Sequence, residues 1–237
     1  MIPLHDDNPT RRPPYITLGI IGLCVAVFLW QLSLGGQGQQ VAAFALGAIP
    51  AVLFHYKSLP PEIALVPPFA TVVTSMFLHG GWLHLIGNML YLWIFGNNVE
   101  DAMGHGRFVV FYLVCGTIAV LAQSLPAPHS TVPMIGASGA ISGVLGAYIL
   151  LYPHARVLVL IPIFFYPLIL GLKAGWVLGF WFVMQLLSSL NAPAGQGGVA
   201  FGAHVGGFVA GMALVALFKR RGVPLLRPPR GQPPSRW

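Results

Sequence analysis

Long hydrophobic runs, separated by short polar segments, make up most of this chain. Because a membrane-spanning helix needs about 20 mostly apolar residues, we predict helices in six of these runs. The predicted spans are Tyr15–Leu34, Trp82–Asn97, Arg107–Leu125, Ser138–Leu151, Ala174–Leu190 and Phe201–Phe218. Two further apolar stretches, Val41–Phe54 and Val157–Leu172, are too short for a span and contain prolines, which interrupt helical hydrogen bonding. We therefore expect them to be loop segments that lie at the membrane interface or are half-buried.

The composition supports an integral membrane protein. Of the 237 residues, 56% are hydrophobic and only 7% are charged, whereas a soluble domain carries about 25% charged residues. The net charge is +7, but no basic patch is interleaved with polar or aromatic residues, so we exclude nucleic acid as a partner. Cys24 and Cys115 both lie in apolar runs and indicate neither a disulfide framework nor a metal site. The predicted fold class is all-α, a polytopic bundle of six transmembrane helices.

Basic residues beside the predicted spans indicate their orientation, because cytoplasmic loops carry an excess of Lys and Arg. With six spans and a cytoplasmic N-terminus, the basic residues that face inward are Arg11, Arg12, Arg107, Arg156, Lys173 and those of the C-terminal tail. Only Lys57 then lies outside, whereas a seventh span at Val157–Leu172 would place the basic tail outside. We expect both termini in the cytoplasm. The chain divides into a tail of residues 1–14, a membrane domain of residues 15–218 and a basic, Pro-rich, disordered tail of residues 219–237.

The most informative polar residue is Ser138, in the segment GASGAISG (residues 136–143) at the start of the fourth span. Polar groups inside a bilayer are costly and usually functional. A helix over Ser138–Leu151 is about 20 Å long, shorter than a hydrocarbon core of about 30 Å. If it ends at the cytoplasmic face, Ser138 lies below the outer surface, and the segment Pro126–Ile135 dips inward with water from outside. Free N–H groups at this helix start can hold an oxyanion.

The sixth span carries His204 near its outer end, in the segment GAHVGGFVAG (residues 202–211). This is the same side and roughly the same depth as Ser138. Glycines at every third or fourth position let two helix backbones approach closely, and a Ser–His proton transfer requires side chains within about 3 Å. His84 and Asn88 are four residues apart and share one face in the outer half of the second span. Three spans therefore bring polar groups to one depth.

Absent residue types narrow the chemistry further. The acidic residues are Asp6, Asp7, Glu62, Glu100 and Asp101, and none lies in the middle of a predicted span. This excludes an aspartyl intramembrane protease, and the lack of an H-E-x-x-H motif excludes a zinc intramembrane protease. No lysine lies within a span, so a Ser–Lys pair is unsupported. Without a buried carboxylate to orient His204, we expect a Ser–His dyad rather than a full triad.

Together these segments resemble the rhomboid family of intramembrane serine proteases, across nearly the whole chain. The matching pieces are HGGWLHLIGN (residues 79–88), Glu100 with Gly104, GASG (residues 136–139), and Ala203-His204 followed by Gly207 and Gly211. The resemblance implies Ser138 as the nucleophile and His204 as the general base and acid. The oxyanion and supporting groups that it implies are Asn88, His84, Gly136 and the backbone amide of Ser138. It also implies cleavage of single-span membrane substrates near their outer ends.

Two positions depart from the family pattern. Many rhomboids carry a Trp-Arg pair in the first outer loop, where this chain has Ala70-Thr71, so we expect the loop to be anchored differently. Some relatives have, at the position of Ser142, a tyrosine that stacks on the catalytic histidine, and this chain lacks it.

We therefore predict an intramembrane serine endopeptidase that needs no cofactor or metal. Its partners are the lipid bilayer and single-span membrane protein substrates. Chain length, minimal tails and the lack of an organelle-targeting segment favour the bacterial inner membrane, with the active site opening to the extracytoplasmic side. The alternative is a non-proteolytic rhomboid-like protein that binds membrane helices for quality control, although such relatives typically lack the serine or the histidine. A second alternative is a small transporter with a metal or proton path through His79, His84 and His204.

Overall fold

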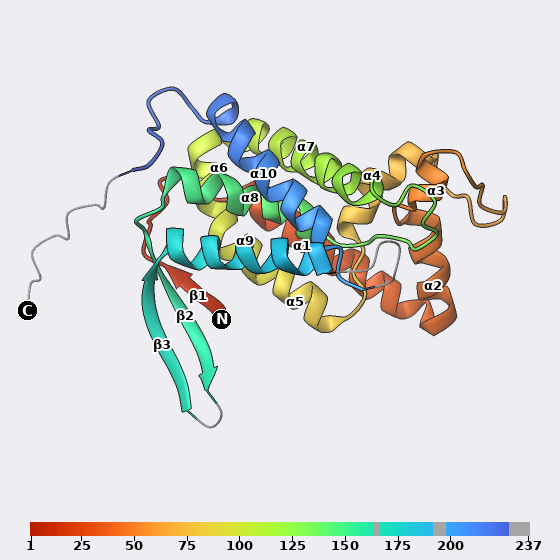
Figure 1. Ribbon diagram of the computed structural model, residues 1–237, viewed down its shortest axis with the longest axis horizontal. Coiled ribbons are helices and arrows are strands. Elements are labelled where there is room, and N and C mark those ends of the chain that lie inside the picture. Colours follow the sequence, from red (N-terminus) through yellow and green to blue (C-terminus); the bar gives the residue numbers. More distant parts are fainter. Residues whose placement is uncertain (164–165, 192–197, 228–237) are drawn as a thin grey trace, which may run out of the picture.

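The computed structural model describes residues 1–163, 166–191 and 198–227 as a helical bundle with a small β-sheet at one end (Figure 1). In chain order the elements are β1 (Ile2–Asp6), α1 (Tyr15–Ser33), α2 (Gly35–Leu46), α3 (Pro50–Leu53), η1 (Pro68–Ala70), α4 (Thr71–Thr74), η2 (Ser75–Phe77), α5 (Trp82–Tyr91), η3 (Leu92–Gly96), α6 (Asn97–Met103), α7 (His105–Ser124), α8 (Ser138–Leu151), β2 (Arg156–Ile163), β3 (Tyr166–Lys173), α9 (Ala174–Asn191) and α10 (Phe201–Phe218). All six hydrophobic runs predicted to be helical are helices.

Four helices in the described part of the chain are long and apolar enough to cross a membrane: α1, α7, α9 and α10. A fifth candidate is the continuous helix Trp82–Met103, formed by α5, the π-helical turn η3 and α6, taken with the segment Pro68–Phe77. These two pieces meet at a bend of 83°. The helix α8 is apolar but short. The structure therefore agrees with a polytopic helical protein.

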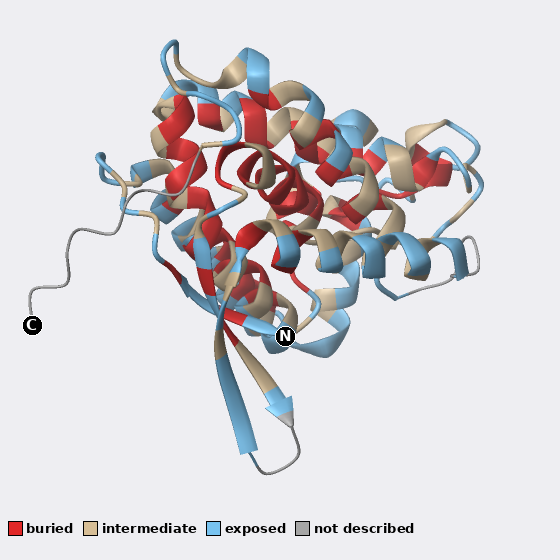
Figure 2. Ribbon diagram, turned by 60° about the vertical axis from the view of Figure 1, so that its left-hand side comes forward, coloured by how far each residue is buried: buried red, intermediate tan, exposed pale blue. Residues whose placement is uncertain are grey.

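The core of the bundle lies around α8. Every residue from Gly139 to Tyr148 is buried, and Figure 2 shows the buried residues gathered along the middle of the molecule. Glycines allow α10 to lie directly against α8, because a Cβ at Gly207 would overlap the carbonyl oxygen of Gly139. One turn further on, Gly211 meets Gly143 in the same way. This backbone-to-backbone packing is typical of small residues in membrane helices, and it confirms the close approach predicted from the glycine spacing.

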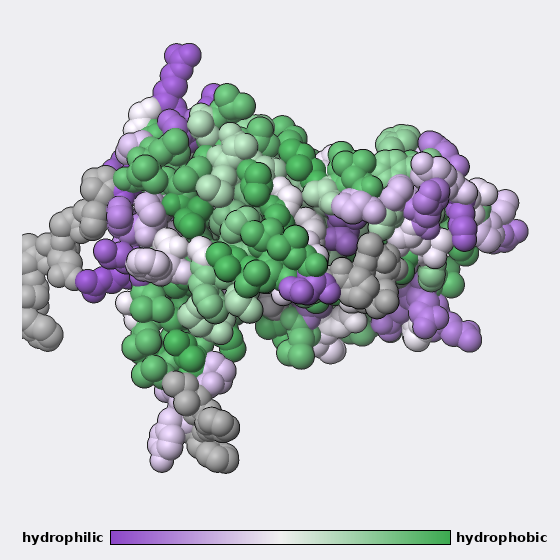
Figure 3. All heavy atoms as spheres, in the orientation of Figure 1, coloured by the Kyte–Doolittle hydropathy of each residue, from purple (hydrophilic) through white to green (hydrophobic). Residues whose placement is uncertain are grey.

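The outside of the bundle is apolar over its middle. Large hydrophobic side chains are exposed along α1 and α9, among them Leu29, Trp176, Phe180 and Leu187. Figure 3 shows a hydrophobic band that separates more hydrophilic ends. Exposed apolar patches of this extent mark an interaction surface. An apolar band around a helical bundle is the surface expected to contact the hydrocarbon core of a lipid bilayer.

The segment Val157–Leu172 forms an antiparallel β-hairpin, so the all-α prediction and the prediction of a loop are wrong here. Strands β2 and β3 pair from Arg156 with Lys173 to Ile163 with Tyr166. Two prolines exclude a helix, and alternation of buried Val157 and Val159 with exposed Leu158 is the period of a strand. Figure 1 shows the hairpin projecting from the bundle near the N-terminus.

The N-terminal residues complete this sheet and are tied to the bundle. Strand β1 pairs antiparallel with β2, and the carboxylate of Asp6 accepts hydrogen bonds from the Tyr148 hydroxyl (2.5 Å) and the Asn98 side-chain amide (3.0 Å). Sequence reasoning did not foresee this strand, because a five-residue strand carries little pattern of its own.

The first part of the C-terminal tail also has defined contacts. The backbone amide of Arg220 donates to the carbonyl of Ala102 (2.9 Å), and that of Leu226 donates to the carbonyl of Leu150 (2.7 Å). These hydrogen bonds join the beginning of the tail to α6 and α8. Residues 228–237 of the predicted tail lie outside the described residues.

Candidate active site

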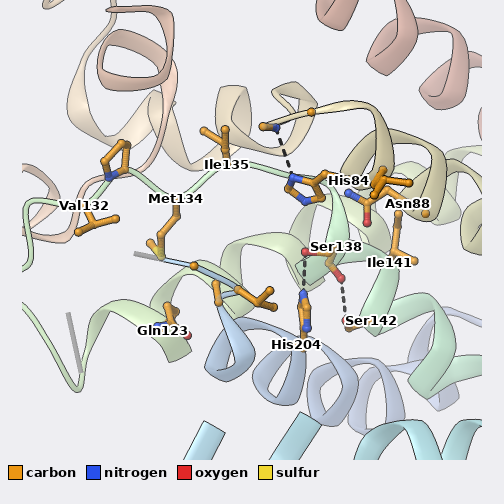
Figure 4. Close-up of a pocket in the computed structure, with 18 of the residues that line it drawn as sticks. His84, Asn88, Gln123, Val132, Met134, Ile135, Ser138, Ile141, Ser142 and His204 are labelled. Atoms are coloured by element: carbon orange, nitrogen blue, oxygen red, sulfur yellow. Dashed lines mark hydrogen bonds between the residues drawn. The ribbon is translucent and has the colours of Figure 1, made fainter. Parts of the chain in front are cut away.

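Ser138 and His204 lie in direct contact. The Ser138 hydroxyl is 2.8 Å from Nε2 of His204, a hydrogen-bonding distance (Figure 4). Ser138 is the first residue of α8, and His204 lies in the first turn of α10. The structure thus brings together the two residues that the sequence analysis selects as nucleophile and base, although they are 66 residues apart in the chain.

The N-terminus of α10 is held in place by α7. The side-chain oxygen of Gln123 on α7 accepts a hydrogen bond from the backbone amide of Ala203 (3.1 Å). The first N–H groups of a helix have no partner within the helix, so this contact satisfies one of them. Since Ala203 directly precedes His204, the contact also fixes the backbone position from which the His204 side chain extends toward α8.

A cavity of about 920 Å³ opens around this pair. Its lining comes from α3, α5, α7, α8, α9 and α10 and from the segments that precede α5, α8 and α10. It includes Ser138, His204, His84 and Asn88, and the lining found among the described residues contains no Asp, Glu, Lys or Arg. The site therefore combines a large apolar space with a few polar groups, as sites for organic substrates commonly do.

His84 and Asn88 both face this cavity from α5 (Figure 4). Nδ1 of His84 accepts a hydrogen bond from the backbone amide of Gly80 (3.3 Å). The side-chain nitrogen of Asn88 is buried and has no hydrogen-bond partner in the described part of the chain. A buried donor without a partner is rare and calls for a functional explanation.

Gly136 gives these two side chains room beside the start of α8. Its φ is +126°, a backbone conformation that side chains other than that of glycine rarely adopt. A Cβ at this position would lie 2.6 Å from Nε2 of His84 and 3.7 Å from the Asn88 side-chain nitrogen. The predicted supporting residues His84, Asn88 and Gly136 are therefore neighbours.

Two residues that contact His204 were missed by the sequence analysis. The side-chain oxygen of Gln185 on α9 is 2.8 Å from Nδ1 of His204. The ring of Trp181, one turn earlier on α9, lies 5.8 Å from the histidine ring, tilted by 35°. Only carboxylates were considered as partners for His204 in the sequence. The feature that could have indicated Gln185 is a side-chain amide within an otherwise apolar predicted helix. Ser142 is not a hydrogen-bond partner of His204, because its hydroxyl donates to the carbonyl of Ser138 (2.6 Å).

His79 and Glu100 lie outside the reacting pair. The backbone of His79 is held from both sides by the Gln31 side chain, at 3.0 and 3.3 Å. Glu100, at the far end of the helix Trp82–Met103, accepts hydrogen bonds from the backbone amides of Ile16 and Thr17 and so caps α1. In the described ranges, no three His, Cys, Asp or Glu side chains are grouped so that they could hold a metal ion.

Comparison with known proteins gives matches over most of the chain. The sequence pattern of the Rhomboid domain matches residues 68–221. Rhomboid protein 1, mitochondrial, of Saccharomyces cerevisiae is 30% identical over 231 residues, which is 95% of this chain and 59% of that protein. The presenilin-associated rhomboid-like protein, mitochondrial, of Homo sapiens is 28% identical over 176 residues, 68% of this chain and 44% of that protein.

A third relative carries an activity in its name. Rhomboid protease GluP of Bacillus subtilis is 43% identical over 76 residues, 32% of this chain and 14% of that protein. The matches thus span between 14% and 59% of the length of these relatives. Because the Rhomboid domain pattern covers residues 68–221, including both Ser138 and His204, and because the fold is a bundle of apolar helices, this chain belongs to the rhomboid family.

Proposed function

We propose that this protein is an intramembrane serine endopeptidase that uses a Ser138–His204 dyad. The observation that carries the proposal is the 2.8 Å contact between the Ser138 hydroxyl and Nε2 of His204 inside a large apolar cavity. A serine is a weak nucleophile until a neighbouring base removes its proton. Rhomboid family members are generally intramembrane serine proteases, and the relative GluP is named a rhomboid protease.

The first half of the reaction forms an acyl-enzyme. The Ser138 oxygen attacks the substrate carbonyl carbon, and its proton moves to Nε2 of His204. The negative charge on the former carbonyl oxygen is stabilised by the backbone N–H groups at the start of α8 and by the Asn88 side-chain nitrogen. The intermediate then collapses, the peptide C–N bond breaks, and His204 gives its proton to the leaving amine.

The second half returns the enzyme to its starting state. A water molecule attacks the ester carbonyl and passes a proton to Nε2 of His204. The bond between the carbonyl carbon and the Ser138 oxygen breaks, and the serine recovers its proton from His204. The carboxylic acid product leaves, so the same histidine serves as base and acid in both halves.

The substrate class follows from the apolar band around the bundle. We propose six membrane spans, the sixth candidate being the short helix α8, and single-span membrane proteins as substrates that reach the cavity from the bilayer. We also propose the cell inner membrane as the location, with both termini in the cytoplasm. The start of α8, with Ser138, then opens to the extracytoplasmic side.

A fluorophosphonate probe tests the dyad without knowledge of the natural substrate, because such probes react with activated serines. The probe should label the purified protein in detergent, and peptide mapping should place the label on Ser138. Labelling should be lost in Ser138→Ala and in His204→Ala, with heat-denatured protein as the control for non-specific reaction. A folded protein that takes no label would contradict the proposal and favour a non-proteolytic rhomboid-like protein.

A further inference from the structure

The second nitrogen of the His204 ring has a specific partner on another helix. Its Nδ1 lies 2.8 Å from the side-chain oxygen of Gln185, on the opposite side of the ring from Ser138. We propose that Gln185 is a positioning residue for His204, whose side-chain oxygen accepts a hydrogen bond from Nδ1 and so presents Nε2 to Ser138. This inference rests on the proposed protease function.

The tautomer of His204 explains why this contact matters. A neutral imidazole carries one N–H and one unprotonated nitrogen. Since Nε2 must take the proton of Ser138, the ring hydrogen has to be on Nδ1, and its partner must be a hydrogen-bond acceptor. The Gln185 oxygen provides this acceptor at 2.8 Å. It holds the ring in the productive tautomer and stabilises the N–H donor when the imidazolium forms.

An amide suits this position better than a carboxylate. In serine proteases with a triad the orienting group is a buried acid, but an ionised carboxylate is expensive inside a membrane protein. The cavity lining found in the described part contains no acid, and Asp6 and Glu100 are bonded to groups at the other end of the bundle. A glutamine supplies the acceptor without the cost of burying a charge.

The other neighbours of His204 cannot select one ring nitrogen. Trp181 and Phe201 face the ring at centroid distances of 5.8 and 6.3 Å, and such contacts fix the plane of a ring rather than its protonation. The Ser142 hydroxyl donates to the carbonyl of Ser138. Among the described residues, Gln185 is therefore the neighbour that distinguishes Nδ1 from Nε2.

The position of Gln185 depends on how α9 packs against α10. The buried residues of α9 are Ala174, Val177 and Leu178, at its beginning, while Gln185 lies further along. There the helix is held by Phe182, whose ring stacks on Phe208 of α10 with centroids 4.6 Å apart. The helix that carries His204 is thus also the helix that locates Gln185.

Two substitutions of similar length separate the hydrogen bond from the packing. Gln185→Met removes the acceptor but keeps an unbranched side chain, and Gln185→Glu keeps an oxygen at the same place. Ser189→Ala, one turn further along α9, removes a polar group without touching His204 and serves as the control. For each variant we would measure kcat and KM on a single-span substrate in liposomes, the rate of fluorophosphonate labelling, and the melting temperature.

We expect Gln185→Met to lower kcat and the labelling rate by about 10-fold, with KM and the melting temperature close to the parent values. Gln185→Glu should recover most of the lost turnover, and Ser189→Ala should behave as the parent. If Gln185→Met does not fold, Gln185→Ala offers a second removal of the acceptor.

Two outcomes would overturn the inference. One is a parental kcat in Gln185→Met. The other is that kcat falls as much in Gln185→Glu as in Gln185→Met and the melting temperature falls in both variants. That result would assign Gln185 to packing alone. Neither outcome touches the proposed function as long as Ser138→Ala is inactive, whereas cleavage by Ser138→Ala would refute the function itself.

Discussion

Asn88 is the residue whose surroundings bear most directly on how charge is stabilised. Its side-chain nitrogen is buried in the cavity wall without a hydrogen-bond partner in the described part of the chain. A buried donor left without a partner costs about 1–3 kcal/mol, and the tetrahedral intermediate would supply the missing acceptor. Gly136 keeps this space open, since a Cβ there would meet His84.

Asn88→Ala should therefore lower kcat by about 10²-fold while KM stays near the parent value, because the lost donor acts on charge that develops only in the transition state. His84→Ala should give a smaller defect of the same kind. Kinetics on a single-span substrate in liposomes, alongside a melting curve for each variant, measure both. Cleavage at the parental rate by Asn88→Ala would make Asn88 a helix-packing residue instead.

How much of the site could be predicted depends on the kind of signal each residue leaves. Ser138 and His204 were found because glycine-rich segments and polar groups in apolar helices stand out in the sequence. Gln185 was missed because a full triad was sought among carboxylates. The contact of Gln185 with His204 joins α9 to α10, and no spacing along the chain reveals it.

Among the elements, the six hydrophobic runs predicted to be spans are all helical, while the strands were missed. The predicted loop Val41–Phe54 is also helical in large part, since it contains the end of α2 and all of α3. The runs are long and carry few charges, so their pattern is strong. The hairpin β2–β3 was taken for a loop because Pro162 and Pro167 argued against a helix. The two prolines instead face each other across the hairpin, next to its turn, where a missing backbone donor is tolerated.

The contact between α8 and α10 is the element-scale feature on which the dyad depends. Gly207→Val should separate these helices, because a branched side chain cannot fit against the carbonyl oxygen of Gly139. We expect a loss of about 3 kcal/mol of stability and a fall in activity, although Gly207 carries no chemistry. Gly179→Val on α9, where a Cβ meets nothing within 4 Å, is the matched control. Parental melting and cleavage by Gly207→Val would place the critical interface elsewhere.

The attachment of β1 to α8 should depend on pH through Asp6. Burial raises the pKa of this carboxyl from 3.8 to about 6, although the hydrogen bond from Tyr148 lowers it in part. A carboxyl whose pKa is raised by folding adds stability that is complete below the unfolded value and is lost as the pH rises through the folded value. The protein should thus be more stable at pH 5 than at pH 7.5, by about 1 kcal/mol from this group.

Melting curves of the parent and of Asp6→Asn between pH 5 and 7.5 test this expectation. The substitution cannot ionise, so the contribution of Asp6 to the pH dependence should disappear. Asp7→Asn removes a neighbouring charge and leaves the Asp6 contacts with Tyr148 and Asn98 in place. Because burial, not the Asp7 charge, is the main cause of the raised Asp6 pKa, this variant should retain most of the dependence. The same pH dependence in Asp6→Asn and the parent would show that other groups produce it.

At the scale of the whole molecule, the candidate site and the sheet lie at opposite ends of α8. Ser138 begins the helix, whereas Tyr148 near its end contacts Asp6 of β1. Basic residues gather at the sheet end. The backbone amide of Arg11 and the side chain of Arg220 both donate to the Asp101 carboxylate, and Arg156 and Lys173 pair at the base of the hairpin. Because positive charge favours the cytoplasmic side, this arrangement supports a cytoplasmic sheet and an extracytoplasmic site.

Reporter fusions test this orientation. Fusions after Leu34 and Asn191 should report the outside, and fusions after Gly104 and at the C-terminus should report the cytoplasm. The charge distribution of the six-span arrangement underlies this expectation. An outside signal from the C-terminal fusion would refute the topology of six spans with both termini in the cytoplasm.

The proposed proteolysis is tested by incubating the purified protein with a single-span membrane protein in liposomes and locating any cut site by mass spectrometry. We expect the parent protein to make one or a few cuts near the extracytoplasmic end of the substrate span. We expect no cleavage by folded Ser138→Ala or His204→Ala, because each substitution removes one member of the 2.8 Å contact. Cleavage at the same site by purified Ser138→Ala would contradict the proposed dyad.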